Sequence, residues 1–177
     1  MEKVLIVVDM LNDFVHKNGV LFFQQGADII DAVKKRIGAY MEEGNTIIFL
    51  CDAHAENDKE FERFPAHAIK KTWGAGVVAK LVDTIGDYKN VVCIPKTRYS
   101  GFYGTPLGGE LNIHKPDKVE VVGVCTSICV MDTVGGLANR DYKTVVPMNA
   151  VADFNAQAHN IALTRMNTLY GAEITQL

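Results

Sequence analysis

Short apolar runs alternate with longer amphipathic segments along the whole chain. Runs rich in β-branched and aliphatic residues are typical of buried strands, and apolar residues at helical spacing predict helices. The expected strands cover residues 4–8, 46–51, 91–95, 119–124, 144–147 and 173–176. The expected helices cover residues 27–43, 77–85, 127–140 and 156–170, with a short helix near the end of the loop 96–109. This alternation predicts an α/β fold, a three-layer α/β/α sandwich around a six-stranded, mainly parallel, Rossmann-like sheet.

Length and composition narrow the class of protein. The chain has 177 residues, of which 48% are hydrophobic and 22% charged, so residues 1–177 are expected to form a single globular domain. The formal net charge is −3 and no run of Lys or Arg stands out, which excludes nucleic acid as the expected partner. No apolar stretch is long enough for a signal peptide or a membrane span. We therefore expect a cytoplasmic protein without a membrane partner, its cysteines reduced.

Chemically capable side chains follow each of the first four expected strands. Parallel strands place their carboxyl ends at one edge of the sheet, and ligands bind there, near the point where the strand order reverses. Taken singly, these residues have ordinary explanations, because an Asp can cap a turn, a Lys can be solvated and a Cys can pack in the core. Their convergence on one crevice favours a functional site. In chain order they are Asp9, then Asp52 and His54, then Lys96, then Cys125 and Cys129.

Three of these side chains form a coherent set for nucleophilic catalysis. Cys129 lies one turn into an expected helix, whose positive N-terminal end favours a thiolate. Asp9 can take the thiol proton and later pass it to a leaving amine, and Lys96 can hold Asp9 and stabilise the thiolate. Backbone N–H groups in the turn 124–129 can form an oxyanion hole. We predict that Cys129 is the nucleophile, and that the other three cysteines are not.

A polar segment after the second expected strand contains a second candidate site. Imidazole and carboxylate groups together are ligands suited to zinc, manganese or iron. The alternative is a solvated surface loop, because the same segment carries several further charged residues. The candidate ligands are Asp52, His54, Glu60 and His67.

The chain resembles the isochorismatase-like cysteine hydrolases, and within that superfamily the nicotinamidases. The resemblance implies a parallel six-stranded sheet between helices and a catalytic triad formed by Asp9, Lys96 and Cys129. The matching segments span the chain in the family's order and are VVDMLNDF (7–14), CDAH (51–54), FPAH and TWGA (within 64–75), K-TRYSGFYGTPL (96–107), GVCTSICV (123–130) and AVADF, H and AL (within 150–163).

The resemblance also implies a metal and a substrate pocket. Asp52, His54 and His67 match the metal ligands of nicotinamidases, and Glu60 matches a fourth ligand found in some members. One divalent ion is implied, with zinc first and manganese or iron as alternatives. The implied aromatic pocket positions are Phe14, Phe64 and Tyr99. The implied oxyanion donors are the N–H groups of Cys125 and Cys129, next to a cis peptide bond between Val124 and Cys125.

The expected reaction is hydrolysis of nicotinamide to nicotinate and ammonia through a cysteine thioester, with the metal binding the pyridine nitrogen. This activity would belong to NAD salvage, and the family suggests a homo-oligomer, either a dimer or a tetramer. Two departures from the family pattern leave the substrate open: Ser127 replaces a common Asp, and Lys70-Lys71 replace smaller residues. The alternatives are a cysteine hydrolase of another small amide or carbamoyl compound, an isochorismatase-type hydrolase, or a non-enzymatic relative.

Overall fold

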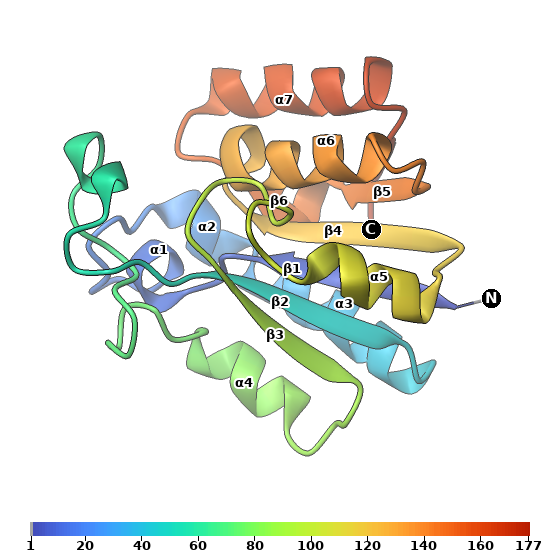
Figure 1. Cartoon of the computed structure of the whole chain (residues 1–177), viewed down its shortest axis with the longest axis horizontal. Coiled ribbons are helices and arrows are strands. Elements are labelled where there is room, and N and C mark those ends of the chain that lie inside the picture. The colour runs from blue at the N-terminus through green and yellow to red at the C-terminus, as the bar shows by residue number, and fades with distance from the viewer. Residues whose placement is uncertain (1) are drawn as a thin grey trace.

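The computed structural model describes residues 2–177, whose central sheet has seven strands. Figure 1 shows how helices surround this sheet. Every strand pairing in it is parallel, with the order β3-β2-β1-β4-β5-β7 and β6 paired to β4. The expected parallel α/β/α sandwich is therefore confirmed. The strands are β1 (Lys3–Val8), β2 (Thr46–Asp52), β3 (Val91–Lys96), β4 (Lys118–Val124), β5 (Thr144–Pro147), β6 (Val151–Ala152) and β7 (Glu173–Thr175).

The strand order reverses between β1 and β4. From β1 the chain adds β2 and then β3 on one side, and β4, β5 and β7 lie on the other side. Val8 pairs with Gly123 at this junction, and Asp52 pairs with Lys96 one strand further out. This register brings the ends of β1, β2, β3 and β4 to one edge, so the crevice beyond that edge is the expected place for a ligand.

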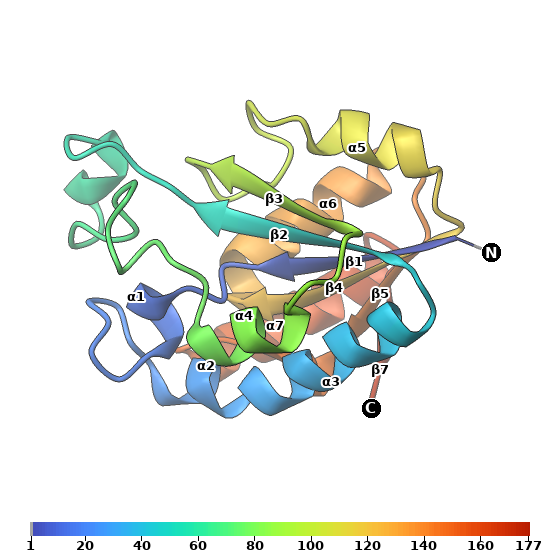
Figure 2. The same cartoon turned by 90° about the horizontal axis from the view of Figure 1, so that it is seen from below.

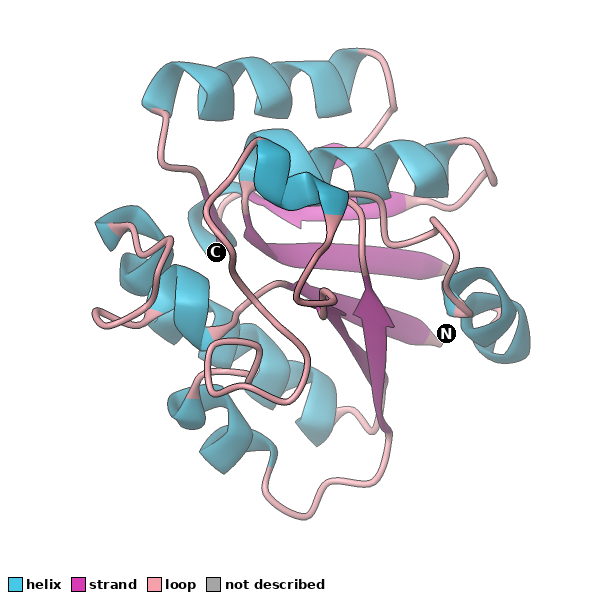
Figure 3. Cartoon of the chain, turned by 60° about the vertical axis from the view of Figure 1, so that its left-hand side comes forward, coloured by secondary structure: helices cyan, strands magenta, loops and turns pink. Residues whose placement is uncertain are grey.

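Helices cover both faces of the sheet (Figures 2 and 3). One face packs against α1, α2, α3 and α4, and the other packs against α5, α6 and α7. The helices are α1 (Asn12–Val15), α2 (Gln24–Asp28), α3 (Ile30–Glu42), α4 (Ala79–Ile85), α5 (Leu107–His114), α6 (Met131–Ala138) and α7 (Ala156–Thr168). Short helical turns are η1 (Lys59–Glu62), η2 (Thr126–Val130) and η3 (Met148–Ala150).

Alternation along β1 explains why its whole run is apolar. Leu5 and Val7 belong to the cluster under α3 and α4, whereas Val4, Ile6 and Val8 belong to the cluster under α5, α6 and α7. Successive side chains of a strand point to opposite faces, so a strand covered on both faces needs apolar residues at every position. All five are fully buried.

The observed secondary structure differs from the elements expected from the sequence in three places. The sheet has a seventh strand, the two-residue β6, which is too short to show a period. The helix expected over 27–43 is two helices, α2 and α3, that meet at Ile29. The helix expected over 127–140 begins with one π-helical turn, η2, and only then continues as α6. Tertiary contacts, which no local periodicity encodes, decide all three.

Among residues 2–177, no helix is long and apolar enough to cross a membrane.

Candidate active site and metal centre

Asp9 leaves the end of β1 in an unusual backbone conformation. Its φ angle is +49°, in the left-handed region that few residues other than glycine adopt. On the neighbouring strand, Gly123 has a φ of +111°, and a Cβ built there would lie 2.1 Å from the carbonyl oxygen of Val8. Only glycine therefore lets β4 approach the β1 end this closely, and the turn at Asp9 directs its side chain into the site.

Lys96 joins the other two residues of the expected triad, Asp9 and Cys129, inside the protein. Its Nζ lies 2.7 Å from Oδ2 of Asp9, 2.5 Å from Oδ1 of Asp52 and 3.4 Å from Sγ of Cys129. Oδ1 of Asp9 accepts a hydrogen bond of 2.8 Å from the backbone N–H of Asp52. All four side chains are buried, so these contacts lie where charge interactions are strong. The structure thus brings Asp9, Lys96 and Cys129 together, with Asp52 as an additional partner of Lys96.

Burial and neighbouring charges set the protonation of this group. Burial first and then the Asp52 carboxylate raise the pKa of Asp9, and against the lowering effect of Lys96 the pKa reaches about 6. Burial lowers the pKa of Lys96, but the acidic groups around it prevail and hold that pKa well above its usual value. Burial also raises the pKa of the Cys129 thiol, which Lys96 only partly opposes. Burial therefore disfavours the thiolate of Cys129, and its attack requires an adjacent base such as Asp9.

The turn that carries Cys129 is held by partners from the C-terminal part of the chain. The peptide bond between Val124 and Cys125 is cis, as predicted. The N–H and hydroxyl of Ser127 both donate to Oδ2 of Asp153, at 2.8 and 2.7 Å. Ser127, which departs from the family pattern, therefore binds a buried carboxylate supplied by the segment before α7.

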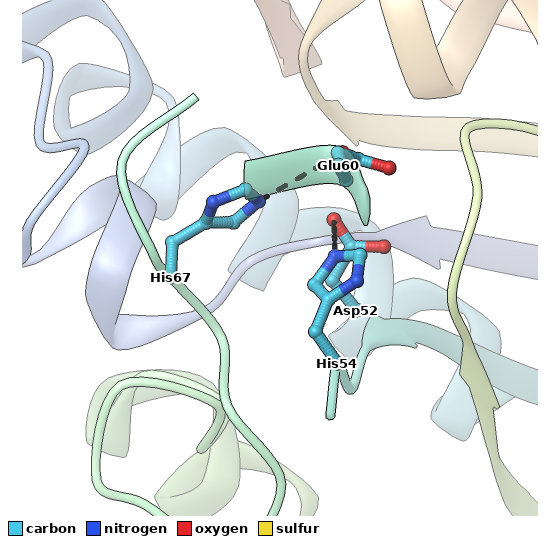
Figure 4. Close-up of side chains that lie close together, drawn as sticks. All are labelled: Asp52, His54, Glu60 and His67. Atoms are coloured by element: carbon cyan, nitrogen blue, oxygen red, sulfur yellow. Dashed lines mark ion pairs between the residues drawn. The ribbon is translucent and has the colours of Figure 1, made fainter. Parts of the chain in front are cut away.

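The four expected metal ligands meet in one buried cluster next to the triad (Figure 4). Each offers one ligand atom, and these atoms all lie within 4.8 Å of one another. Nε2 of His54 lies 3.6 Å from Oδ2 of Asp52, and Nε2 of His67 lies 3.9 Å from Oε1 of Glu60. The alternative of a solvated loop is wrong for these four residues, because all of them are buried.

Hydrogen bonds orient both imidazole rings toward the centre of this cluster. Nδ1 of His54 lies 3.1 Å from Oδ2 of Asp58, and Nδ1 of His67 lies 2.7 Å from the carbonyl oxygen of Pro65. An Nδ1–H that donates to an oxygen leaves Nε2 with a lone pair, which is the form that binds metals. Nε2 of His54 and Oε2 of Glu60 are buried without a hydrogen-bond partner among the described residues. Two nitrogen and two carboxylate ligands with unmatched buried atoms fit a divalent metal ion.

A cavity of about 370 Å³ opens onto both groups of residues. Asp9 and Cys129 line one part of it, and Asp52, Glu60 and His67 line another. The remaining walls are mostly apolar and include all three expected pocket residues, Phe14, Phe64 and Tyr99, together with Val20, Leu21, Phe22, Phe23, Val124, Cys125, Ile128 and Phe154. A single small molecule in this cavity can touch the thiol and the candidate metal ligands at once.

Sequence reasoning missed several residues that hold the site. Asp13 accepts a 2.8 Å hydrogen bond from the N–H of Ala68, next to His67. Asp58 contacts His54, and Nδ1 of His159 lies 2.9 Å from the Thr126 hydroxyl in the turn before Cys129. Asp13, Asp153 and His159 lie inside the family segments quoted above, but the segments alone carry no information about their partners.

Comparisons with known proteins define the class. The sequence profile of the isochorismatase domain matches residues 3–177, and the chain belongs to that family. An isochorismatase family protein of Bacillus subtilis named PncA, described as uncharacterized, is 34% identical over 183 residues, covering 99% of this chain and 100% of that protein. A crystal structure of nicotinamidase/pyrazinamidase PncA from Bacillus subtilis superposes with a TM-score of 0.93, at 33% identity, covering 99% of this chain and 100% of the other.

Two further structures extend the comparison. Pyrazinamidase of Pyrococcus horikoshii in complex with zinc has a TM-score of 0.91 and 30% identity, with both chains fully covered. N-carbamoylsarcosine amidase from Thermoplasma acidophilum has a TM-score of 0.88 and 27% identity, covering 99% of this chain and 96% of that one. The chain is therefore an enzyme of the isochorismatase family, a hydrolase of amide C–N bonds, and its fold is close to that of nicotinamidases.

A thiol reagent is expected to react first with Cys93. This residue is exposed on β3, and its sulfur lies 3.8 Å from that of Cys51. The hydrogen bond with Cys51 lowers the pKa of Cys93 to about 7, although burial opposes the shift, and a lowered pKa makes an exposed thiol more reactive. Iodoacetamide should therefore modify Cys93 before Cys129, with most of the activity retained. Peptide mass mapping at partial labelling checks this, and loss of activity in step with Cys93 labelling would contradict it.

Proposed function

We propose that this enzyme is a nicotinamidase, which hydrolyses nicotinamide to nicotinate and ammonia. The observation that supports this most is the shared cavity. The thiol of Cys129 and the group of candidate metal ligands face the same space, which has aromatic walls. The two polar groups of a flat pyridine amide match the two parts of this site. Its carboxamide carbon can react with the thiol, and its ring nitrogen can bind a metal. Aromatic side chains pack well against its ring.

The proposed reaction uses the triad in two halves. Asp9 takes the proton of Cys129 as the sulfur attacks the amide carbon and forms a C–S bond. The oxygen that gains charge is stabilised by the N–H groups of Cys125 and Cys129. The C–N bond then breaks, and Asp9 returns the proton to the nitrogen, which leaves as ammonia. Asp9 next removes a proton from water as the water oxygen adds to the thioester carbon. The C–S bond then breaks, Asp9 returns this proton to the sulfur to restore the thiol, and the released acid ionises in water to nicotinate.

Lys96 stabilises the negative charge that moves between its neighbours during these proton transfers. Its ammonium lies between Asp9, Asp52 and Cys129, so it can balance negative charge on whichever of them is ionised. The residues proposed to hold a metal are Asp52, His54, Glu60 and His67. A divalent ion there, with zinc as the proposed identity, supplies a Lewis acid that can bind a pyridine nitrogen. The protein itself supplies the orientation of the ring and the acid–base chemistry.

The cavity favours a neutral substrate over an anionic carbamoyl acid. Among the described residues that line it, Asp9, Asp52 and Glu60 are acidic and none is Arg or Lys. The carboxylate of a substrate such as N-carbamoylsarcosine would find no Arg or Lys side chain in the lining, and it could pair only with the proposed metal ion. A second buried charge, as in the doubly anionic isochorismate, would then have no partner, which is costly, so anionic substrates are disfavoured.

The test compares four substrates by ammonia or product release. Nicotinamide should exceed benzamide in kcat/KM by at least about 100-fold. The two amides differ only in the ring nitrogen, which a metal ion in the site would bind. N-carbamoylsarcosine and isochorismate should be no better than benzamide. His67→Ala should lower the value for nicotinamide to that for benzamide and leave benzamide nearly unchanged. Equal kcat/KM for nicotinamide and benzamide in the metal-loaded enzyme would overturn the proposal.

The cellular setting stays a prediction from the family resemblance. We propose that the nicotinate released by this enzyme enters NAD salvage. We also propose that the enzyme is a cytoplasmic homo-oligomer, either a dimer or a tetramer.

A further inference from the structure

We propose that Asp58 is a positioning residue for the metal centre, locked in place by Arg98. The inference rests on the proposed metal site but not on the proposed substrate. Neither residue lines the cavity, and neither belongs to the proposed ligands. Their influence is expected to act through His54.

One carboxylate group orders both ends of the segment that carries His54 and Glu60. Oδ2 of Asp58 lies 3.1 Å from Nδ1 of His54. Oδ1 of Asp58 accepts a 2.9 Å hydrogen bond from the N–H of Glu60, at the start of η1. The side chain of Asp58 is 8% exposed, so water competes little for these bonds. Two of the four proposed ligands thus depend on the placement of one acid.

Arg98 fixes that acid from the opposite side. Its Nη1 lies 3.0 Å from Oδ1 and 3.2 Å from Oδ2 of Asp58, and it also donates to the carbonyl of Thr97. Arg98 follows Lys96 by two residues and precedes Tyr99, which lines the cavity. The pair therefore connects the segment that carries His54 and Glu60 to the segment that directly follows β3. That segment begins next to Lys96, the last residue of β3, and contains Tyr99 of the cavity wall.

The two imidazoles of the cluster differ in what holds them. Nδ1 of His67 faces a neutral carbonyl oxygen, that of Pro65, whereas Nδ1 of His54 faces a carboxylate. A carboxylate acceptor fixes the ring's tautomer and orientation and makes the opposite nitrogen a stronger metal ligand. Removing the charge of Asp58 should therefore weaken the His54 bond to a metal and leave that of His67 intact.

The experiment measures zinc binding by the full chain in competition with a chromophoric chelator, without any substrate. Asp58→Asn keeps the shape of the side chain and removes its charge, and we expect zinc affinity to fall by about 10- to 100-fold. Glu56→Gln is the matched control, because it removes the same charge from an exposed position of the same segment. It should leave the affinity within twofold of the wild type.

A spectroscopic readout separates positioning from loss of fold. In the cobalt-loaded protein, Asp58→Asn should shift the visible d–d bands, whereas Glu56→Gln should reproduce the wild-type spectrum. If Asp58→Asn does not fold, Arg98→Met decides, since it should weaken zinc binding in the same direction but less. An unchanged zinc affinity in the folded variant, or a wild type that binds no zinc, would overturn the inference. Zinc binding as expected without nicotinamide hydrolysis would instead refute only the proposed substrate.

Discussion

Replacing Cys129 with alanine is expected to lower kcat for nicotinamide by at least about 10⁴-fold, because the covalent route disappears with the sulfur. The fold should survive. The side chain is small and buried at the start of the segment that leads into α6, and its loss removes one sulfur from the cluster under α5, α6 and α7. Steady-state ammonia release measures the activity, and circular dichroism melting measures the fold.

Cys125→Ala is the control for that experiment. Cys125 also lines the cavity, but the hydrogen bond from Nζ of Lys96 goes to the sulfur of Cys129. Its proposed part in catalysis is a backbone N–H, which alanine retains. Cys125→Ala should therefore keep most of the activity. An inactive Cys125→Ala together with an active Cys129→Ala would show that the nucleophile has been assigned to the wrong cysteine.

Lys96→Met is expected to have the second large effect, on stability as well as on activity. The substitution leaves Asp9 and Asp52 buried and facing each other without the ammonium that lies 2.7 and 2.5 Å from them. Removing one partner from a buried ionic group costs about 3–5 kcal/mol in the free energy of unfolding. Activity should be lost because no cation balances the thiolate. Urea unfolding, monitored by circular dichroism, measures the stability.

Lys118→Met, on β4 of the same sheet, is the matched control. Lys118 forms a 3.1 Å ion pair with Glu173, with 43% and 61% of the two side chains exposed. Solvent screens such a pair, so its loss should cost at most about 1 kcal/mol. Comparable unfolding free energies for the Lys96→Met and Lys118→Met variants would mean that the buried pair does not stabilise the fold as the geometry indicates.

Much of the fold and of the candidate site follows from local patterns in the sequence. The fully apolar β1 run indicates a strand covered on both faces, and its alternation with helical segments indicates a parallel sheet. Parallel strands share one carboxyl edge, so Asp9, Asp52, Lys96 and Cys129 could be expected to meet before any distance was known. The family resemblance favoured a metal site over a solvated loop for the candidate ligands in the polar segment. It also added the cis peptide bond, which pattern alone does not predict.

Tertiary structure alone decided the partners that hold those residues. Asp58 is one of several charged residues in a polar segment, and only its burial against His54 and Arg98 separates it from solvated neighbours such as Glu56. Asp153 meets Ser127 across 26 residues of chain, and Asp13 meets Ala68 across 55. Periodicity reports which face of an element is buried. It carries no information on which distant polar group will lie opposite, because that depends on how the whole chain packs.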